Sequence, residues 1–126
     1  MPLTYDYYDD ADILELFFNE LEADAAINLT PDIILHIHTP TAQPVSLIFN
    51  NYRYLTQPTD YGWRTFPLYK FQWPPAWRDL VWSMLFLSPL NEWLTLVAYH
   101  SPQQRDFIPL LTVKPFLSVM TPEAVY

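Results

Sequence analysis

Three histidines are the side chains whose spacing could bring a metal ion into this chain. His36 and His38 stand two apart in an alternating apolar and polar segment, so on a strand both imidazoles point to the same face. Zinc enzymes hold their metal with such a pair and a third donor, which His100 would supply from a later strand. No His-Glu-x-x-His motif or clustered acid supports the pair, so ordinary sheet histidines are favoured. A metal-dependent hydrolase or lyase is the enzyme alternative.

Other catalytic chemistries find less support in the residues. A carboxylate pair at Asp12 and Glu15 falls on the solvated face of a predicted helix, whereas a general acid needs burial to shift its pKa. The single glycine, Gly62, cannot build a phosphate-binding loop, a dinucleotide fingerprint or a nucleophile elbow. The absence of cysteine excludes disulfides and thiolate metal sites. The sequence therefore predicts no cofactor, and a protein that is not an enzyme.

Negative charge is concentrated in the first 24 residues, which hold eight of the 14 acidic residues and no lysine or arginine. The remaining chain is balanced, with six acids against the six bases. This layout disfavours nucleic acid as a partner, because phosphate binding needs concentrated positive charge. It predicts an acidic docking face for a basic protein, made by Asp10, Asp12, Glu15, Asn19 and Glu22.

Aromatic side chains make up 17% of the chain and include five tryptophans and nine tyrosines, more than one small core normally absorbs. Tryptophan and tyrosine concentrate binding energy at protein interfaces. A sheet with helices on one side would also leave its other face for a partner or a second copy of the chain. The predicted contact surface comprises Trp63, Tyr69, Trp73, Trp82, Phe86 and Trp93.

The elements that must position these residues follow from periodicity and from proline. Ile13, Leu14, Phe17, Phe18 and Leu21 form one helical stripe, which predicts an amphipathic helix over about 10–27. Pro74 and Pro75 open a second helix. This second helix is predicted over about 75–87. Strands are predicted at about 32–39, 44–55, 63–73, 92–100 and 107–113. Residues 114–126 are left unassigned or form a short helix.

These elements predict a single α+β domain over residues 1–126, in the order α-βββ-α-ββ(-α). An antiparallel sheet of about five strands with helices packed on one face buries the apolar stripes. No family motif can be quoted from the residues. The predicted order of elements, the small size and the low isoelectric point resemble those of type III secretion chaperones; no sequence motif is shared. The resemblance implies an acidic dimer that holds an extended client segment.

The function favoured by the sequence is that of a small acidic protein-binding module: a chaperone, assembly factor, inhibitor or accessory subunit of a larger complex. One alternative is an immunity or counter-defence inhibitor whose acidic helix mimics nucleic acid. The other is the three-histidine metal enzyme. The acidic start at Met1 to Asp12 does not fit a signal peptide, so a cytoplasmic location with only indirect membrane contact is expected.

Overall fold

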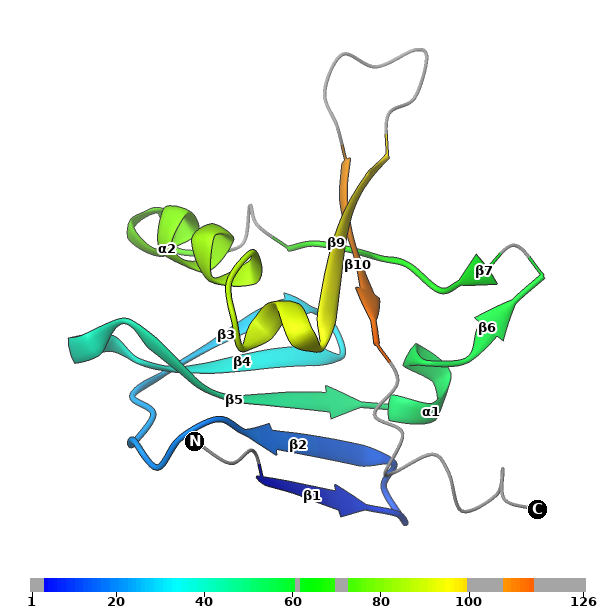
Figure 1. Ribbon diagram of the computed structural model, residues 1–126, viewed down its shortest axis with the longest axis horizontal. Helices are drawn as coiled ribbons and strands as arrows, with labels where there is room; N and C mark the ends of the chain where they lie inside the picture. The colour runs from blue at the N-terminus through cyan, green and yellow to red at the C-terminus, as the bar shows by residue number, and fades with distance from the viewer. Residues whose placement is uncertain (1–3, 61, 70–72, 100–107, 115–126) are drawn as a thin grey trace.

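The computed structural model describes residues 4–60, 62–69, 73–99 and 108–114. Five of its strands form one antiparallel sheet in the order β1-β2-β5-β4-β3 (Figure 1). The coarse class predicted from the sequence, mixed α+β with an antiparallel sheet, is confirmed, but only two of the five predicted strands, 32–39 and 44–55, belong to this sheet. The five strands are β1 (Thr4–Tyr8), β2 (Ile13–Phe17), β3 (Ala25–Thr30), β4 (Ile33–His38) and β5 (Gln43–Asn50).

The predicted helix at 10–27 is wrong, because this segment contains β2 and the start of β3. Leu14, Leu16 and Phe18 alternate on the buried face of the sheet, and β2 pairs with β1 on one side and β5 on the other. Asn19 then ends the strand pattern: its side-chain amide donates to the Pro44 carbonyl at 2.9 Å, and its Oδ1 accepts from the Leu21 N–H at 3.0 Å. Such local side-chain bonds compete with regular structure.

Two of the predicted strands, 32–39 and 44–55, are confirmed as β4 and β5, which pair as an antiparallel hairpin. The connection runs through the short 3-10 helix η1 (Thr39–Thr41) and Ala42, whose φ of 54° is left-handed. The second strand ends earlier than predicted. Asn51, also left-handed at φ 56°, turns the chain into the single helical turn α1 (Tyr52–Leu55).

The strand predicted at 63–73 is wrong in extent. Its described residues form only the two-residue strands β7 (Gly62–Trp63) and β8 (Phe66–Pro67), while 70–72 lie outside the described residues. Pro67 lacks the N–H that a continuing ladder would need. β7 pairs with the two-residue strand β6 (Pro58–Thr59), and Gly62 at its start has a φ of 114° that an L side chain rarely adopts.

The second half of the chain folds over the five-stranded sheet. The predicted helix at 75–87 is confirmed as α2 (Pro75–Leu85), which begins with Pro75 directly after the cap residue Pro74. The 3-10 helix η3 (Leu90–Glu92) leads into β9 (Leu94–Tyr99), which pairs with β10 (Ile108–Val113). The strands predicted at 92–100 and 107–113 are thus confirmed within the described residues, although the first begins at Leu94. These strands do not extend the first sheet as expected, but form a separate sheet in the order β8-β10-β9.

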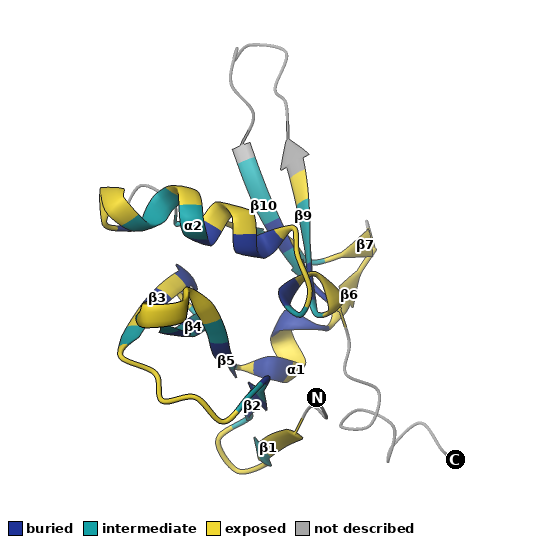
Figure 2. Ribbon diagram, turned by 60° about the vertical axis from the view of Figure 1, so that its left-hand side comes forward, coloured by how far each residue is buried: buried dark blue, intermediate teal, exposed yellow. Residues whose placement is uncertain are grey.

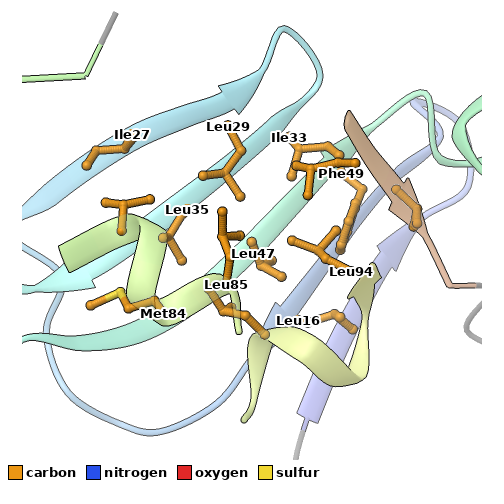
Figure 3. Close-up of a cluster of buried hydrophobic side chains, with 14 of the residues drawn as sticks. Leu16, Ile27, Leu29, Ile33, Leu35, Leu47, Phe49, Met84, Leu85 and Leu94 are labelled. Carbon is orange, nitrogen blue, oxygen red and sulfur yellow. The ribbon is translucent and has the colours of Figure 1, made fainter. Parts of the chain in front are cut away.

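One hydrophobic core joins the two halves (Figure 3). Strand residues such as Leu35 and Leu47 belong to the same buried cluster as Met84 and Leu85 of α2. Burying a side chain of this size stabilises a fold by roughly 1.5–3 kcal/mol. The cluster comprises Leu14, Leu16, Phe18, Ile27, Leu29, Ile33, Leu35, Ile37, Leu47, Phe49, Tyr52, Leu55, Leu68, Trp73, Val81, Met84, Leu85, Leu90, Leu94, Leu111 and Val113.

The N-terminal strands also remove the basis of the topological resemblance to type III secretion chaperones, whose order begins with a helix. Where that helix was expected, the chain forms β2 and the start of β3. Residues 115–126, which include the expected terminal helix, lie outside the described residues. None of the helices in the described part of the chain has both the length and the apolar character needed to cross a bilayer.

Candidate functional site

The outer side of α2 carries an exposed aromatic pair. Val81, Met84 and Leu85 are buried, whereas Trp82 and Phe86, four residues apart, are exposed. Figure 2 shows buried and exposed stretches alternating along the ribbon of α2. The rings of Trp82 and Phe86 meet edge to face, with centroids 5.5 Å apart. Trp82 is 36% exposed, Phe86 53% and the following Leu87 61%. We call Trp82, Phe86 and Leu87 the α2 patch.

Several backbone bonds hold the α2 patch where the helix ends. The Phe86 N–H donates to the Ser83 carbonyl at 3.2 Å, and the Leu87 N–H donates to the Met84 carbonyl at 3.1 Å. The side-chain amide of Asn91 then caps the Phe86 carbonyl at 3.2 Å. Because Leu90 is fully buried, the turn after the helix is anchored to the core. The α2 patch is therefore presented on a fixed backbone.

A cleft of about 460 Å³ lies next along the chain from the α2 patch. Three segments that are far apart in the sequence form it: the end of β2, the start of β5 and the turn that follows α2. We call it the 88–93 cleft. The described residues that line it are Phe18, Asn19, Gln43, Pro44, Ser88, Pro89, Glu92 and Trp93.

Glu92 is the single ionisable side chain among these lining residues. Its Oε2 accepts a hydrogen bond from the Ser88 hydroxyl, four residues earlier. The nearby Lys114 ammonium donates to the Asn91 carbonyl at 2.8 Å, and no ion pair joins Lys114 to Glu92. The described wall of the 88–93 cleft thus combines one carboxylate, neutral polar groups and the rings of Phe18 and Trp93.

Comparisons with protein-family models, with curated proteins and with solved structures find no match to this chain.

The six aromatic residues predicted as a contact surface do not form one surface. Trp82 and Phe86 meet on α2, and Trp93 lines the cleft while packing partly against the core. Trp63 is 53% exposed and lines a separate hollow beside β9 and β10. The other two contact the sheet edge at β3. Trp73 is buried, and its indole N–H donates to the Asn28 carbonyl at 2.8 Å. Tyr69 is half-buried, and its backbone N–H donates to the Leu29 carbonyl at 2.8 Å.

The predicted acidic docking face does not form either, because it required the helix at 10–27. Asp10 is exposed in the turn between β1 and β2, and Glu15 lies half-buried within β2. Asn19 lines the 88–93 cleft at the opposite end of that strand. Glu22 is exposed in the following loop, where its backbone carbonyl contacts the His38 ring. The acidic side chains are therefore spread over both ends of the sheet.

Asp12, the remaining member of that set, has a structural role at the β1–β2 turn, where its φ of 56° is left-handed. Its carboxylate accepts from the Tyr7 hydroxyl at 2.7 Å and from the Arg53 N–H at 3.1 and 3.2 Å, which joins the hairpin to α1. Burial, followed by the hydrogen bond and charge of Asp12, raises the pKa of Tyr7 to about 12. Arg53 also pairs with Asp9 at 2.6 Å, but both side chains are exposed and such pairs contribute little.

His36 and His38 share a face of β4, as the alternation predicts, but each is bonded to a different neighbour. Nδ1 of His36 lies 3.0 Å from the Ser46 hydroxyl, which lies 3.5 Å from a Glu15 oxygen. Nδ1 of His38 lies 2.7 Å from the Glu22 carbonyl oxygen. No three His, Asp or Glu side chains within 4–60, 62–69, 73–99 and 108–114 are grouped closely enough to hold a metal ion. The third predicted donor, His100, lies outside these residues.

Sequence reasoning missed Leu87 and most of the residues of the 88–93 cleft. Ser88 and Glu92 stand four residues apart directly after a predicted helix, and this spacing could have indicated a turn with a fixed carboxylate. Gln43 and Pro44 gave no such signal, because only the pairing of β2 with β5 brings them near Asn19.

Proposed function

We propose that this chain is a small protein-binding module that docks through the α2 patch. The observation that carries the proposal is the exposed contact between Trp82 and Phe86 on a helix whose other side already fills the core. Aromatic residues held rigidly at a surface are those that concentrate binding energy at protein interfaces. The neighbouring Leu87, at 61% exposed, extends the same apolar surface.

The size of a stable interface indicates what else the partner contacts. A standard interface covers roughly 800 Å² on each protein, more than three side chains provide. The α2 patch would form the apolar centre of the interface, and the 88–93 cleft would form part of its polar rim. The module would act as a chaperone, assembly factor, inhibitor or accessory subunit of a larger complex.

Charge supports a basic partner. The chain has a net charge of −8, and its first 24 residues contain no lysine or arginine. Four acidic side chains in this segment are exposed: Asp6, Asp10, Glu20 and Glu22. Because such a field attracts a positively charged protein before contact, it raises the association rate. The proposed partner is therefore a protein with a basic surface around an apolar docking element.

Quantitative co-purification from the cells that naturally produce the chain tests the proposal. We expect a partner that is retained by the wild type and lost by a Trp82→Ala, Phe86→Ala double variant. Tyr8→Ala is the matched control, because Tyr8 is 51% exposed on β1, at the edge of the sheet farthest from β3 in strand order. Loss of the same partner by both variants, or retention by both, would contradict docking through the α2 patch.

A further inference from the structure

We infer that the 88–93 cleft binds an arginine side chain, which on the proposed function belongs to the docking partner. The inference deepens that function by naming the chemistry of one contact beside the α2 patch. Leu87 and Ser88 are consecutive, so a segment lying over the patch can continue directly into the cleft.

The first support is the charge of the cleft. Glu92 is its single ionisable lining residue among those described, and Oε1 of Glu92 has no hydrogen-bond partner in the described part of the chain. An anionic ligand would be repelled here, whereas a purely apolar ligand would remove the Glu92 carboxylate from water without compensation.

The second support is the shape and chemistry of a guanidinium group. It is planar, always charged, and donates two parallel N–H bonds to a carboxylate. It also stacks on aromatic rings, and the half-buried Trp93 lines the cleft beside the largely buried Phe18. The exposed Gln43 is a further polar lining residue. A lysine ammonium would use the carboxylate but gain less from the rings, which favours arginine.

The third support is that the carboxylate is already positioned. The Ser88 hydroxyl donates to Oε2 of Glu92 and fixes that side chain across one turn. On the other wall, both polar atoms of the Asn19 side chain are used, by the Pro44 carbonyl and the Leu21 N–H. The cleft therefore keeps its form without a ligand, and pre-organisation lowers the entropy lost on binding.

Nuclear magnetic resonance titration tests the inference with the full chain. The probe is N-acetyl-arginine methylamide, and the matched probe is its citrulline analogue, which has nearly the same shape without the charge. We expect the arginine probe to shift the indole N–H signal of Trp93 saturably and the citrulline probe to leave it nearly unchanged. Trp93→Phe identifies that signal. Equal shifts from the two probes would overturn the inference.

A matched pair of variants locates the charge. Glu92→Gln keeps an acceptor for the Ser88 hydroxyl, and we expect it to weaken arginine binding about two- to fivefold, the scale of an exposed ion pair. Glu22→Gln removes the same charge from an exposed loop residue outside the lining. A folded Glu92→Gln variant that binds the arginine probe as the wild type does would overturn the inference.

The two proposals fail separately. If the α2 patch variants lose the partner while the arginine probe does not distinguish Glu92→Gln from wild type, the protein-binding function stands and the arginine site is rejected. If the probe binds as expected while the α2 patch variants keep every partner, the arginine site stands and docking through the α2 patch is rejected.

Discussion

The two sides of α2 are both apolar, yet they differ in what covers them. On the inner side, Val81, Met84 and Leu85 are 0%, 6% and 3% exposed within the core. On the outer side, Trp82 and Phe86 are 36% and 53% exposed. The comparison teaches that hydrophobic character alone does not separate a core residue from a docking residue. What distinguishes the two sides is that one packs in the core and the other is exposed to solvent.

The energetics of the two sides differ accordingly. A helix of 11 residues is marginal in isolation, so α2 is stabilised chiefly by its packing on the sheet. The inner residues supply that packing, and the outer pair adds a ring contact of about 1 kcal/mol. Exposed large apolar side chains in contact with each other are typical of interaction sites. We therefore expect the α2 patch to contribute little to folding while being required for the proposed binding.

The largest expected effect comes from truncating the inner side. Leu85→Ala leaves a cavity in the core, and we expect it to lower the free energy of unfolding by about 3 kcal/mol. Phe86→Ala, one residue along on the outer side, is expected to change it by less than about 1 kcal/mol. Urea unfolding followed by tryptophan fluorescence measures both. Equal losses from the neighbouring substitutions would break the comparison between the two sides of α2.

Carboxylates show the same distinction at the β1–β2 turn. Asp12 bonds Tyr7 and the backbone of Arg53, whereas Asp10 is exposed two residues before it. We expect Asp12→Ala to lower the free energy of unfolding by about 1–2 kcal/mol, because two donors lose their acceptor. Asp10→Ala is expected to have almost no effect on stability. Thermal unfolding of the two variants makes the comparison, and a stable Asp12→Ala protein would contradict the structural role.

Alkaline titration sharpens the same point with a smaller effect. The pKa of Tyr7 rises from about 10 in the unfolded chain to about 12 in the fold, because burial and Asp12 disfavour the phenolate. The stability from this group is complete below pH 10 and is lost as the pH rises through 12. Solvent contact reduces the loss to roughly 1 kcal/mol. Tyr7→Phe should show a smaller decline in free energy of unfolding across this range than the wild type, measured in urea. Identical declines would contradict the raised pKa.

The sequence predicted those elements whose hydrophobic periodicity fits only one kind of secondary structure. β4, β5 and α2 follow from local alternation or from proline at a helix start. The segment at 10–27 satisfies two periods: the helical stripe that includes Ile13 and Phe17, and the alternation of Leu14, Leu16 and Phe18. Pairing of β2 with both β1 and β5 decides between them. That pairing is tertiary and is not visible in the local pattern.

The candidate site divides in the same way. Trp82 and Phe86 could be predicted, because their four-residue spacing lies off the core stripe of one helix. Trp73 could not be recognised as core, since its indole partner is the Asn28 carbonyl, 45 residues away. The 88–93 cleft depends on the meeting of Asn19, Pro44 and Glu92 from three segments. Residues that only the tertiary fold brings together have no characteristic spacing in the sequence by which they could be recognised.

Photo-crosslinking from position 86 tests docking through the α2 patch most directly. Phe86 is replaced by the photoreactive amino acid p-benzoylphenylalanine in the cells that naturally produce the chain, and Tyr8 is replaced in a parallel strain as the matched exposed position. We predict one discrete adduct with a basic protein from position 86 and no such adduct from position 8. No adduct from position 86, or the same adduct from both positions, would contradict the account.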